Sequence, residues 1–301
     1  MTATREVQGH APALAIVRDE AIRLGPQGQL VAVVSHPAEG QARTPRAPAV
    51  IVLNAGVLHR VGPHRLHVSL TRHLAGLGFP AVRLDLGGIG DSIASTDATT
   101  FWESAVADTR EAMTGLGGML GARRFVIFGV CAGADNALST ALADERVAGI
   151  VLVDPAVYPT PRSLYRELRR RLVEPGGAPL ALRWAARHAR TRLRRELRRL
   201  EQWRRGVAGE PPAEGREYPP VEKFGANLAA LADRGVGVLA CYAGMHGENY
   251  NHEDQIFESF PRLRGRIDRA YFSGANHTFT QLDDQAALIA TTARWISGRF
   301  G

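Results

Sequence analysis

The sequence predicts an α/β fold in which a mainly parallel sheet is covered by helices. Short apolar, β-branched runs alternate with helical patterns through most of the chain, as expected for consecutive βαβ units. The 301 residues are 45% hydrophobic and 22% charged, so the chain can bury a sizeable core. The alternation breaks once, between Pro159 and Pro220, which predicts a helical insertion into an otherwise regular fold.

The predicted strands are short apolar runs. An antiparallel pair is expected first, near residues 13–18 and at 29–36. The later runs lack polar alternation, which is typical of strands buried on both faces. They lie at 49–53, 81–85, 125–128, 149–153, 236–242 and 267–272.

Helical patterns follow most of these runs. Pro63 suits the first position of a helix, and Leu66, Leu70 and Leu74 recur every four residues behind it. Glycines at 76 and 78 end this helix. Further helices are predicted at 101–113, 132–143, 254–260 and 281–299.

The interruption divides the chain into a first core part at 1–157, a basic helical lid at 158–220 and a second core part at 221–301. Prolines bound the interruption, and leucines inside it recur at helical spacing. We expect this lid to lie over the carboxyl ends of the strands, where open α/β sheets bind their ligands.

The positive charge of the chain is concentrated in this lid. Residues 162–205 hold 15 Arg and 4 Glu, a balance of +11, whereas the whole chain carries +7 and the remainder therefore −4. Arg194 with Arg198, and Arg195 with Arg199, repel at i,i+4 spacing, and an anionic partner would relieve that repulsion. An acidic acyl carrier protein or the phosphates of coenzyme A would suit these four arginines. An anionic membrane face and a merely solvated helix face remain alternatives. Nucleic acid is not expected, because no recognition motif is present and the core is not basic.

Several classes of protein are not expected. Residues 1–10 show no signal-peptide pattern, and no window of 18 apolar residues predicts a transmembrane helix. Two cysteines, Cys131 and Cys241, do not make a disulfide framework, so a reducing cytoplasm fits better. No metal or other cofactor is expected.

The motif Gly129-Val130-Cys131-Ala132-Gly133 follows a predicted strand and opens a predicted helix. This is the context of a nucleophile elbow, G-x-S-x-G, with cysteine in place of serine. The sharp turn needs both glycines, since a side chain at Gly129 or Gly133 would collide with neighbouring backbone. It also places the middle residue at a helix N-terminus, which favours an anionic thiolate. We therefore expect Cys131 to be a catalytic nucleophile.

His277 is the expected general base. In enzymes built on this elbow the chain order is nucleophile, acid, histidine. Of the ten histidines, His277 alone combines that order with a loop between the last predicted strand and the last predicted helix.

The acid is expected in the loop that follows the strand ending near Tyr242. Glu248 is preferred there because it lies a few residues past the strand end. Asp254 suits the start of the next helix, and an asparagine at 249 or 251 is also able to orient a histidine. Asp154, after the preceding strand, is a further candidate.

Two backbone N–H groups are expected to form an oxyanion hole. One belongs to Ala132, directly after the nucleophile, and the other to Val57 in the loop after the strand at 49–53.

With these residues in place, the chain resembles the α/β-hydrolase superfamily over residues 30–157 and 221–301. More narrowly, it resembles hydrolases associated with the bacterial exosortase A system and related acyl hydrolases. The resemblance rests on Asn54-Ala55-Gly56 with the segment 59–65, on the segment 83–92, and on the elbow with Ala134. It implies a cysteine or serine nucleophile with a histidine base, acting on acyl esters or thioesters. The arginine-rich lid departs from what that resemblance implies.

A cysteine nucleophile favours thioester chemistry. Its attack on a thioester exchanges one thioester for another, and the acyl-cysteine passes to water, an amine or a hydroxyl. The expected activity is therefore that of a thioesterase or acyltransferase. A small-molecule ester or lactone hydrolase, as in the dienelactone hydrolases that use cysteine on this fold, is the first alternative. A non-catalytic scaffold is the second.

Overall fold

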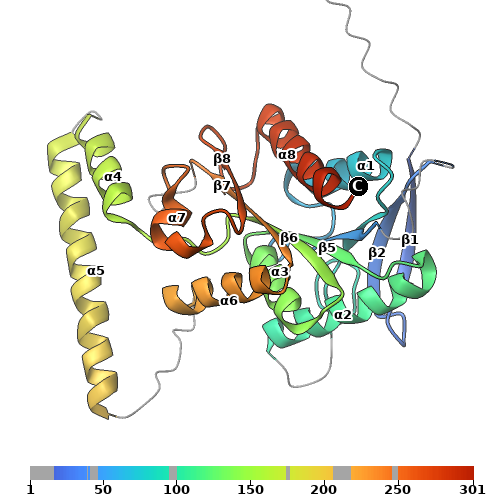
Figure 1. Ribbon diagram of the computed structural model, residues 1–301. Helices are drawn as coiled ribbons and strands as arrows, with labels where there is room; N and C mark the ends of the chain where they lie inside the picture. The colour runs from blue at the N-terminus through green and yellow to red at the C-terminus, as the bar shows by residue number, and fades with distance from the viewer. Residues whose placement is uncertain are drawn as a thin grey trace, which may run out of the picture.

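The computed structural model describes residues 17–38, 40, 47–94, 100–173, 177–205, 218–245 and 250–301. Side chains at 188, 191–192, 194–196 and 198–205 also lie outside this description. The chain forms one eight-stranded sheet with helices on both faces (Figure 1).

The sheet is parallel except at one end. The strands follow the order β1-β2-β4-β3-β5-β6-β7-β8. β2 is antiparallel to both neighbours, and every pairing from β4 to β8 is parallel. The strands are β1 (Arg18–Leu24), β2 (Leu30–His36), β3 (Ala49–Val52), β4 (Ala81–Leu84), β5 (Phe125–Val130), β6 (Val147–Val153), β7 (Gly237–Ala243) and β8 (Asp268–Phe272). The predicted α/β fold with a mainly parallel sheet is confirmed.

The sheet separates two apolar cores. Side chains alternate along each strand, so Ile51 of β3 points into one core and Val50 and Val52 into the other. Helices α2 (Phe101–Leu120), α3 (Ala132–Ala143) and α6 (Val221–Asp233) cover the first core. Helices α1 (Leu66–Gly76) and α8 (Leu282–Phe300) cover the second. Burial on both faces explains why the central strands read as unbroken apolar runs.

Two elements differ from the sequence prediction, the first strand and helix α6. The first strand begins at Arg18, and residues 13–16 of the predicted run lie outside the described part. Helix α6 was not predicted, although Phe224, Leu228 and Leu231 recur at helical spacing and are buried in the core. The predicted boundary between lid and core at 220 coincides with the start of this helix, since Pro220 is the residue that precedes it.

Two helices form a hairpin in the interruption, α4 (Pro161–Val173) and α5 (Gly177–Arg205). The hairpin is joined to α7 (Gln255–Ser259) through α4. Thr160 Oγ1 donates to Glu258 at 2.7 Å, and Asn251 Nδ2 donates to the Ser163 carbonyl at 2.8 Å.

The hairpin stands out from the side of the body, at the left of Figure 1. Within the described part, α5 packs chiefly on α4, where Ala181 and Trp184 are buried. The expected position of the lid over the strand ends is therefore not confirmed by the described contacts. The physical reason is that α5, a helix of 29 residues, packs chiefly on α4 within the described part.

Two short 3₁₀ helices, at Pro63–Arg65 and Pro261–Leu263, complete the described elements. No helix within the described ranges is long and apolar enough to cross a bilayer.

Candidate active site

The turn between β5 and α3 holds Cys131 in a strained backbone conformation. Its φ of 57° and ψ of −120° are rarely adopted by a residue other than glycine. Neighbouring backbone maintains this geometry, because the Cys131 N–H donates to the Val153 carbonyl at 2.9 Å and the Cys131 carbonyl accepts from the Ala134 N–H at 2.9 Å. A residue held in this way at the top of a sheet is well placed to meet a substrate.

The two glycines of the motif allow close backbone approach, as the sequence predicts. A Cβ on Gly129 would overlap the Gly133 carbonyl, and a Cβ on Gly133 would overlap the Asn54 carbonyl. The second contact brings the loop after β3 against the first turn of α3. Cys131 is half-buried at the N-terminus of α3, where the helix dipole favours a negative charge.

His277 lies in the loop between β8 and α8 and contacts both other candidate groups. Its Nδ1 is 2.8 Å from Asp154 Oδ2. The hydrogen bond to Asp154, followed by one to Cys131, raises the pKa of His277 from 6.5 to about 9. The structure thus brings Cys131, His277 and Asp154 together from the ends of β5, β8 and β6.

Asp154 is buried and uses both carboxylate oxygens. Oδ1 accepts the Ala243 N–H at 2.8 Å, while Oδ2 faces His277. The backbone of Asp154 has a positive φ of 48°, and its N–H donates to the Cys241 carbonyl at 2.9 Å. The carboxylate is therefore fixed by β7 on one side and orients the imidazole on the other.

The preferred acid, Glu248, lies outside the described residues. The carboxylate that contacts His277 is instead Asp154, which the sequence offered as a further candidate. Asp254 is paired with Arg269 at 3.0 Å, and Asn251 donates to the backbone of α4. Asp154 directly follows β6, and β6 lies next to β5, the strand that carries Cys131. The position of Asp154 after a strand is visible in the sequence, but the adjacency of β6 and β5 is not.

The two expected oxyanion donors come from the elbow itself and from the turn after β3. Ala132 is the first residue of α3, and its N–H has no acceptor within the helix. Val57 lies in the turn after β3 with 87% of its surface exposed. Its assignment as the second donor stays a prediction.

A buried carboxylate holds the loop that carries Val57. Asp85, at the end of β4, accepts from the Arg60 N–H at 2.6 Å and from Asn54 Nδ2 at 3.0 Å. The Arg60 guanidinium also contacts Asp85 at 2.5 Å and Asp91 at 2.7 Å. Asn54 in turn donates to the Leu58 carbonyl at 2.9 Å. Asp85 and Arg60 belong to segments that carry the family resemblance, but the sequence pattern predicts no role for either side chain.

The four arginines that the sequence predicts to bind an anionic partner lie on α5. Arg194, Arg195, Arg198 and Arg199 belong to the described helix, but their side chains are outside the description. Their expected contact with an acidic carrier protein or coenzyme A therefore stays a prediction.

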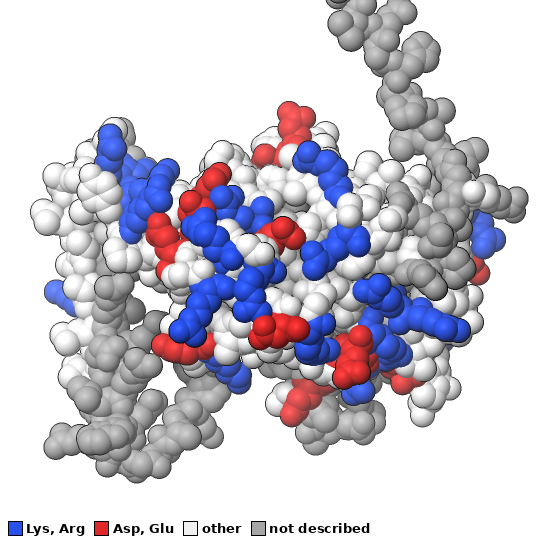
Figure 2. Space-filling model, viewed as in Figure 1, with Lys and Arg blue, Asp and Glu red and all other residues white. Residues whose placement is uncertain are grey.

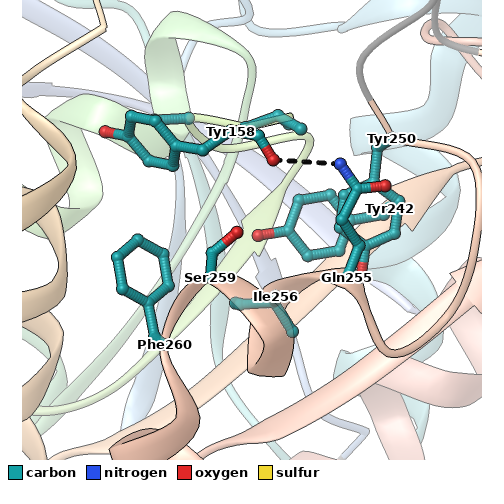
Figure 3. Close-up of a pocket in the computed structure, with 9 residues that line it drawn as sticks. Tyr158, Tyr242, Tyr250, Gln255, Ile256, Ser259 and Phe260 are labelled. Carbon is teal, nitrogen blue, oxygen red and sulfur yellow. Dashed lines mark hydrogen bonds between the residues drawn. The ribbon is translucent and has the colours of Figure 1, made fainter. Parts of the chain in front are cut away.

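A small pocket lies between the segment after β6, the tyrosines at 242 and 250, and α7 (Figure 3). Its walls come from the segment after Pro155, from Tyr242 and Tyr250, and from α7, whose Gln255 donates to the Tyr158 carbonyl at 3.1 Å. Tyr242 and Tyr250 stack at 3.7 Å between ring centroids. Neither Cys131 nor His277 lines this pocket, so we interpret it as a packing gap rather than the catalytic cleft.

Comparison with known proteins agrees with this architecture. A family model described as the alpha/beta hydrolase fold matches residues 48–238. No curated protein matches the chain significantly.

Solved structures share the fold at low sequence identity. A puromycin-hydrolyzing peptidase from Mycobacterium tuberculosis aligns with a TM-score of 0.59 and 17% identity, over 97% of this chain and 40% of that one. The chain thus spans about two fifths of that peptidase. A carboxylesterase from Bacillus subtilis aligns with a TM-score of 0.55 and 18% identity, over 95% of this chain and 94% of that one. An esterase from Pyrococcus furiosus aligns with a TM-score of 0.57 and 12% identity, over 95% of this chain and 92% of that one.

The family model covers more than half of the sequence, and the sheet order and the elbow conform to it. The chain belongs to the alpha/beta hydrolase fold family.

Proposed function

We propose that this chain is an acyl-transfer enzyme that forms an acyl-cysteine at Cys131 from a thioester. The observation that carries the proposal is the contact of one imidazole, His277, with both Cys131 and the buried carboxylate of Asp154. We assign Asp154, rather than Glu248, as the acid that orients His277.

The raised pKa of His277 is compatible with a cysteine mechanism, because the contact with Cys131 is one of its causes. With a pKa of about 9, the imidazole is protonated at neutral pH. A protonated histidine stabilises a neighbouring thiolate. The resting state that fits these contacts is a thiolate at Cys131 beside an imidazolium at His277.

The proposed reaction has two halves. The Cys131 thiolate attacks the thioester carbonyl carbon, and the tetrahedral oxyanion accepts from the Ala132 N–H and the proposed Val57 N–H. The donor's C–S bond then breaks, and its sulfur takes the proton from His277. In the second half, neutral His277 removes a proton from water, an amine or a hydroxyl as that acceptor attacks the acyl-cysteine. Cys131 leaves as a thiolate, and His277 is again protonated.

The substrate class is an acyl thioester of coenzyme A or of an acidic acyl carrier protein. Thioester exchange at a cysteine is nearly balanced in free energy, so the acyl group stays activated for transfer. The resemblance of the motifs to exosortase-associated acyl hydrolases supports the same class. We place the enzyme in the cytoplasm, where its two thiols stay reduced.

A small-molecule ester or lactone hydrolase is the second candidate. The similarity to structures named as a carboxylesterase and an esterase favours it. Such an enzyme would use the same three residues, but it would act on esters at least as fast as on thioesters.

Intact-mass spectrometry of the full chain tests the proposal. The protein is incubated with a panel of acyl-coenzyme A thioesters and, separately, with p-nitrophenyl esters. We expect an acyl adduct on the wild type that is absent from Cys131→Ala, and faster acylation from thioesters.

The second cysteine provides a matched control. Cys241 is buried, so Cys241→Ala should leave the adduct intact. An adduct on another residue, or turnover that survives Cys131→Ala, contradicts the proposal. If esters alone acylate Cys131, the second candidate replaces it. If neither class acylates the folded protein, the proposal is contradicted and a non-catalytic scaffold is favoured.

A further inference from the structure

Helix α5 carries an apolar stripe that the described part of the chain leaves uncovered. Leu182, Leu193 and Leu197 are 71%, 61% and 50% exposed. Apolar side chains of this size are usually buried when they recur on one helix face. Three exposed leucines on one helix therefore indicate a surface that binds a partner.

The three leucines share one face of the helix. At 100° per residue, Leu193 and Leu197 fall within about 60° of Leu182 around the axis. The contact with α4 is on a different side, where Ala181 and Trp184 are only 2% and 6% exposed. The stripe from Leu182 to Leu197 is about 22 Å long at 1.5 Å per residue. It is therefore a straight ridge on the outside of the hairpin.

Exposed arginines accompany this ridge. Arg183, Arg187 and Arg190 are exposed on α5. Residues 162–205 carry +11, while the rest of the chain carries −4. In Figure 2, basic side chains gather at the upper end of the hairpin, whereas acidic and basic side chains are interspersed over the body. An anionic surface would therefore attract the hairpin more strongly than the rest of the chain, which favours one orientation of the molecule on that surface.

We propose that α5 binds the surface of an anionic lipid bilayer and lies parallel to its plane. An amphipathic helix with leucines on one face and arginines beside them inserts its apolar face at the boundary of headgroups and acyl chains. Lipid phosphates meet the arginine charge.

The shape of the ridge favours a bilayer over a protein partner. The uncovered leucines lie along a single straight helix that stands out from the body (Figure 1). Such a ridge can insert into a bilayer along its whole length, whereas a protein partner would need a matching groove. The hairpin also projects from the body, so it can reach a plane without steric conflict (Figure 1).

Co-sedimentation of the full chain with vesicles tests this inference. We expect binding to vesicles of phosphatidylcholine with phosphatidylglycerol, and little binding to phosphatidylcholine alone. Raising the salt to about 1 M, where the Debye length is about 3 Å, should release most of the bound protein. Leu193→Asp and Leu197→Asp should each weaken binding by roughly tenfold, because burying one leucine side chain in the bilayer changes the affinity by about that factor.

The body supplies a matched control at Met119, which is 54% exposed on α2. Met119→Asp should bind like the wild type, and far-ultraviolet circular dichroism verifies that all three variants are folded. Cys131→Ala should also bind like the wild type, so this inference and the proposed function fail or succeed separately.

Three results would overturn the inference. The first is no binding to either vesicle. The second is binding that Leu193→Asp and Leu197→Asp leave unchanged. The third is a self-association, or capture of a purified acidic carrier protein, that Leu193→Asp abolishes while vesicle binding is absent. That last result would assign the ridge to a second copy or to the carrier.

Discussion

Replacing Asp154 with asparagine probes the link between the carboxylate and His277. Asparagine keeps the shape and keeps Oδ1 as the acceptor for the Ala243 N–H. It replaces the Oδ2 acceptor 2.8 Å from His277 Nδ1 with an amide nitrogen that donates. The substitution therefore removes the charge and the hydrogen bond but little packing.

The structure sets the expected size of the effect. The pKa of His277 rises from 6.5 to about 9, with the Asp154 hydrogen bond as the largest cause. At 1.36 kcal/mol per unit, the whole shift corresponds to about 3 kcal/mol. Since Cys131 also contributes, we expect Asp154→Asn to lower the pKa of His277 by roughly one to two units.

The direct assay is the NMR titration of the His277 ring in wild type and Asp154→Asn. A parallel measurement is the free energy of unfolding between about pH 6 and pH 10. Because the folded pKa of His277 is raised, its stabilising contribution is full below pH 6.5 and is lost as the pH rises through about 9. The stability gap between the two proteins should therefore narrow toward high pH.

A clear result would refute this reasoning. If the His277 midpoint in Asp154→Asn stays within about half a unit of wild type, Asp154 does not set its pKa. Glu248→Gln is the control, because Glu248 is the alternative acid. A larger loss of acylation rate in Glu248→Gln than in Asp154→Asn would restore Glu248 as the acid.

Four further predictions follow from burial and charge. Iodoacetamide should alkylate Cys131 well before Cys241, since burial raises the pKa of the Cys241 thiol, and peptide mapping that finds equal labelling would contradict this. Asp85→Ala should lower the free energy of unfolding by about 3 kcal/mol, because it leaves buried donors unpaired, and a change below about 1 kcal/mol in urea would exclude that role. Gly133→Ala should cost about 1–3 kcal/mol through overlap with backbone, seen as a lower Tm. Arginine hydrogen bonds lower the pKa of Asp144 to about 2, so Asp144→Asn should destabilise the protein above pH 4 and progressively less as the pH falls toward 2.

Two of the three candidate catalytic residues could be placed from local sequence patterns. The elbow around Cys131 depends on a strand, two glycines and a helix that are all contiguous in the chain. His277 was found because the segment after the last strand holds a single histidine. Neither inference needs the distance between strands.

The acid required information that the chain order does not contain. The ends of β6 and β7 both lie near the elbow, and the sequence offered a carboxylate after each of them. The choice depends on which carboxylate reaches His277 Nδ1, and that distance is set by the packing of four strands from different parts of the chain. The same limit applies to Asp85, whose partners lie 25 and 31 residues away in sequence.

The sequence by itself determined the α/β fold, the helical character of the basic segment and the identity of the candidate nucleophile and base. These features follow from periodicity and from short contiguous motifs, which express local backbone preferences. Only the tertiary structure decided that Asp154 meets His277, that Asp85 holds the loop after β3, and that α5 packs chiefly on α4 within the described part. The first two depend on contacts between segments distant in the chain, whose distances are fixed by strand order and packing rather than by neighbouring residues.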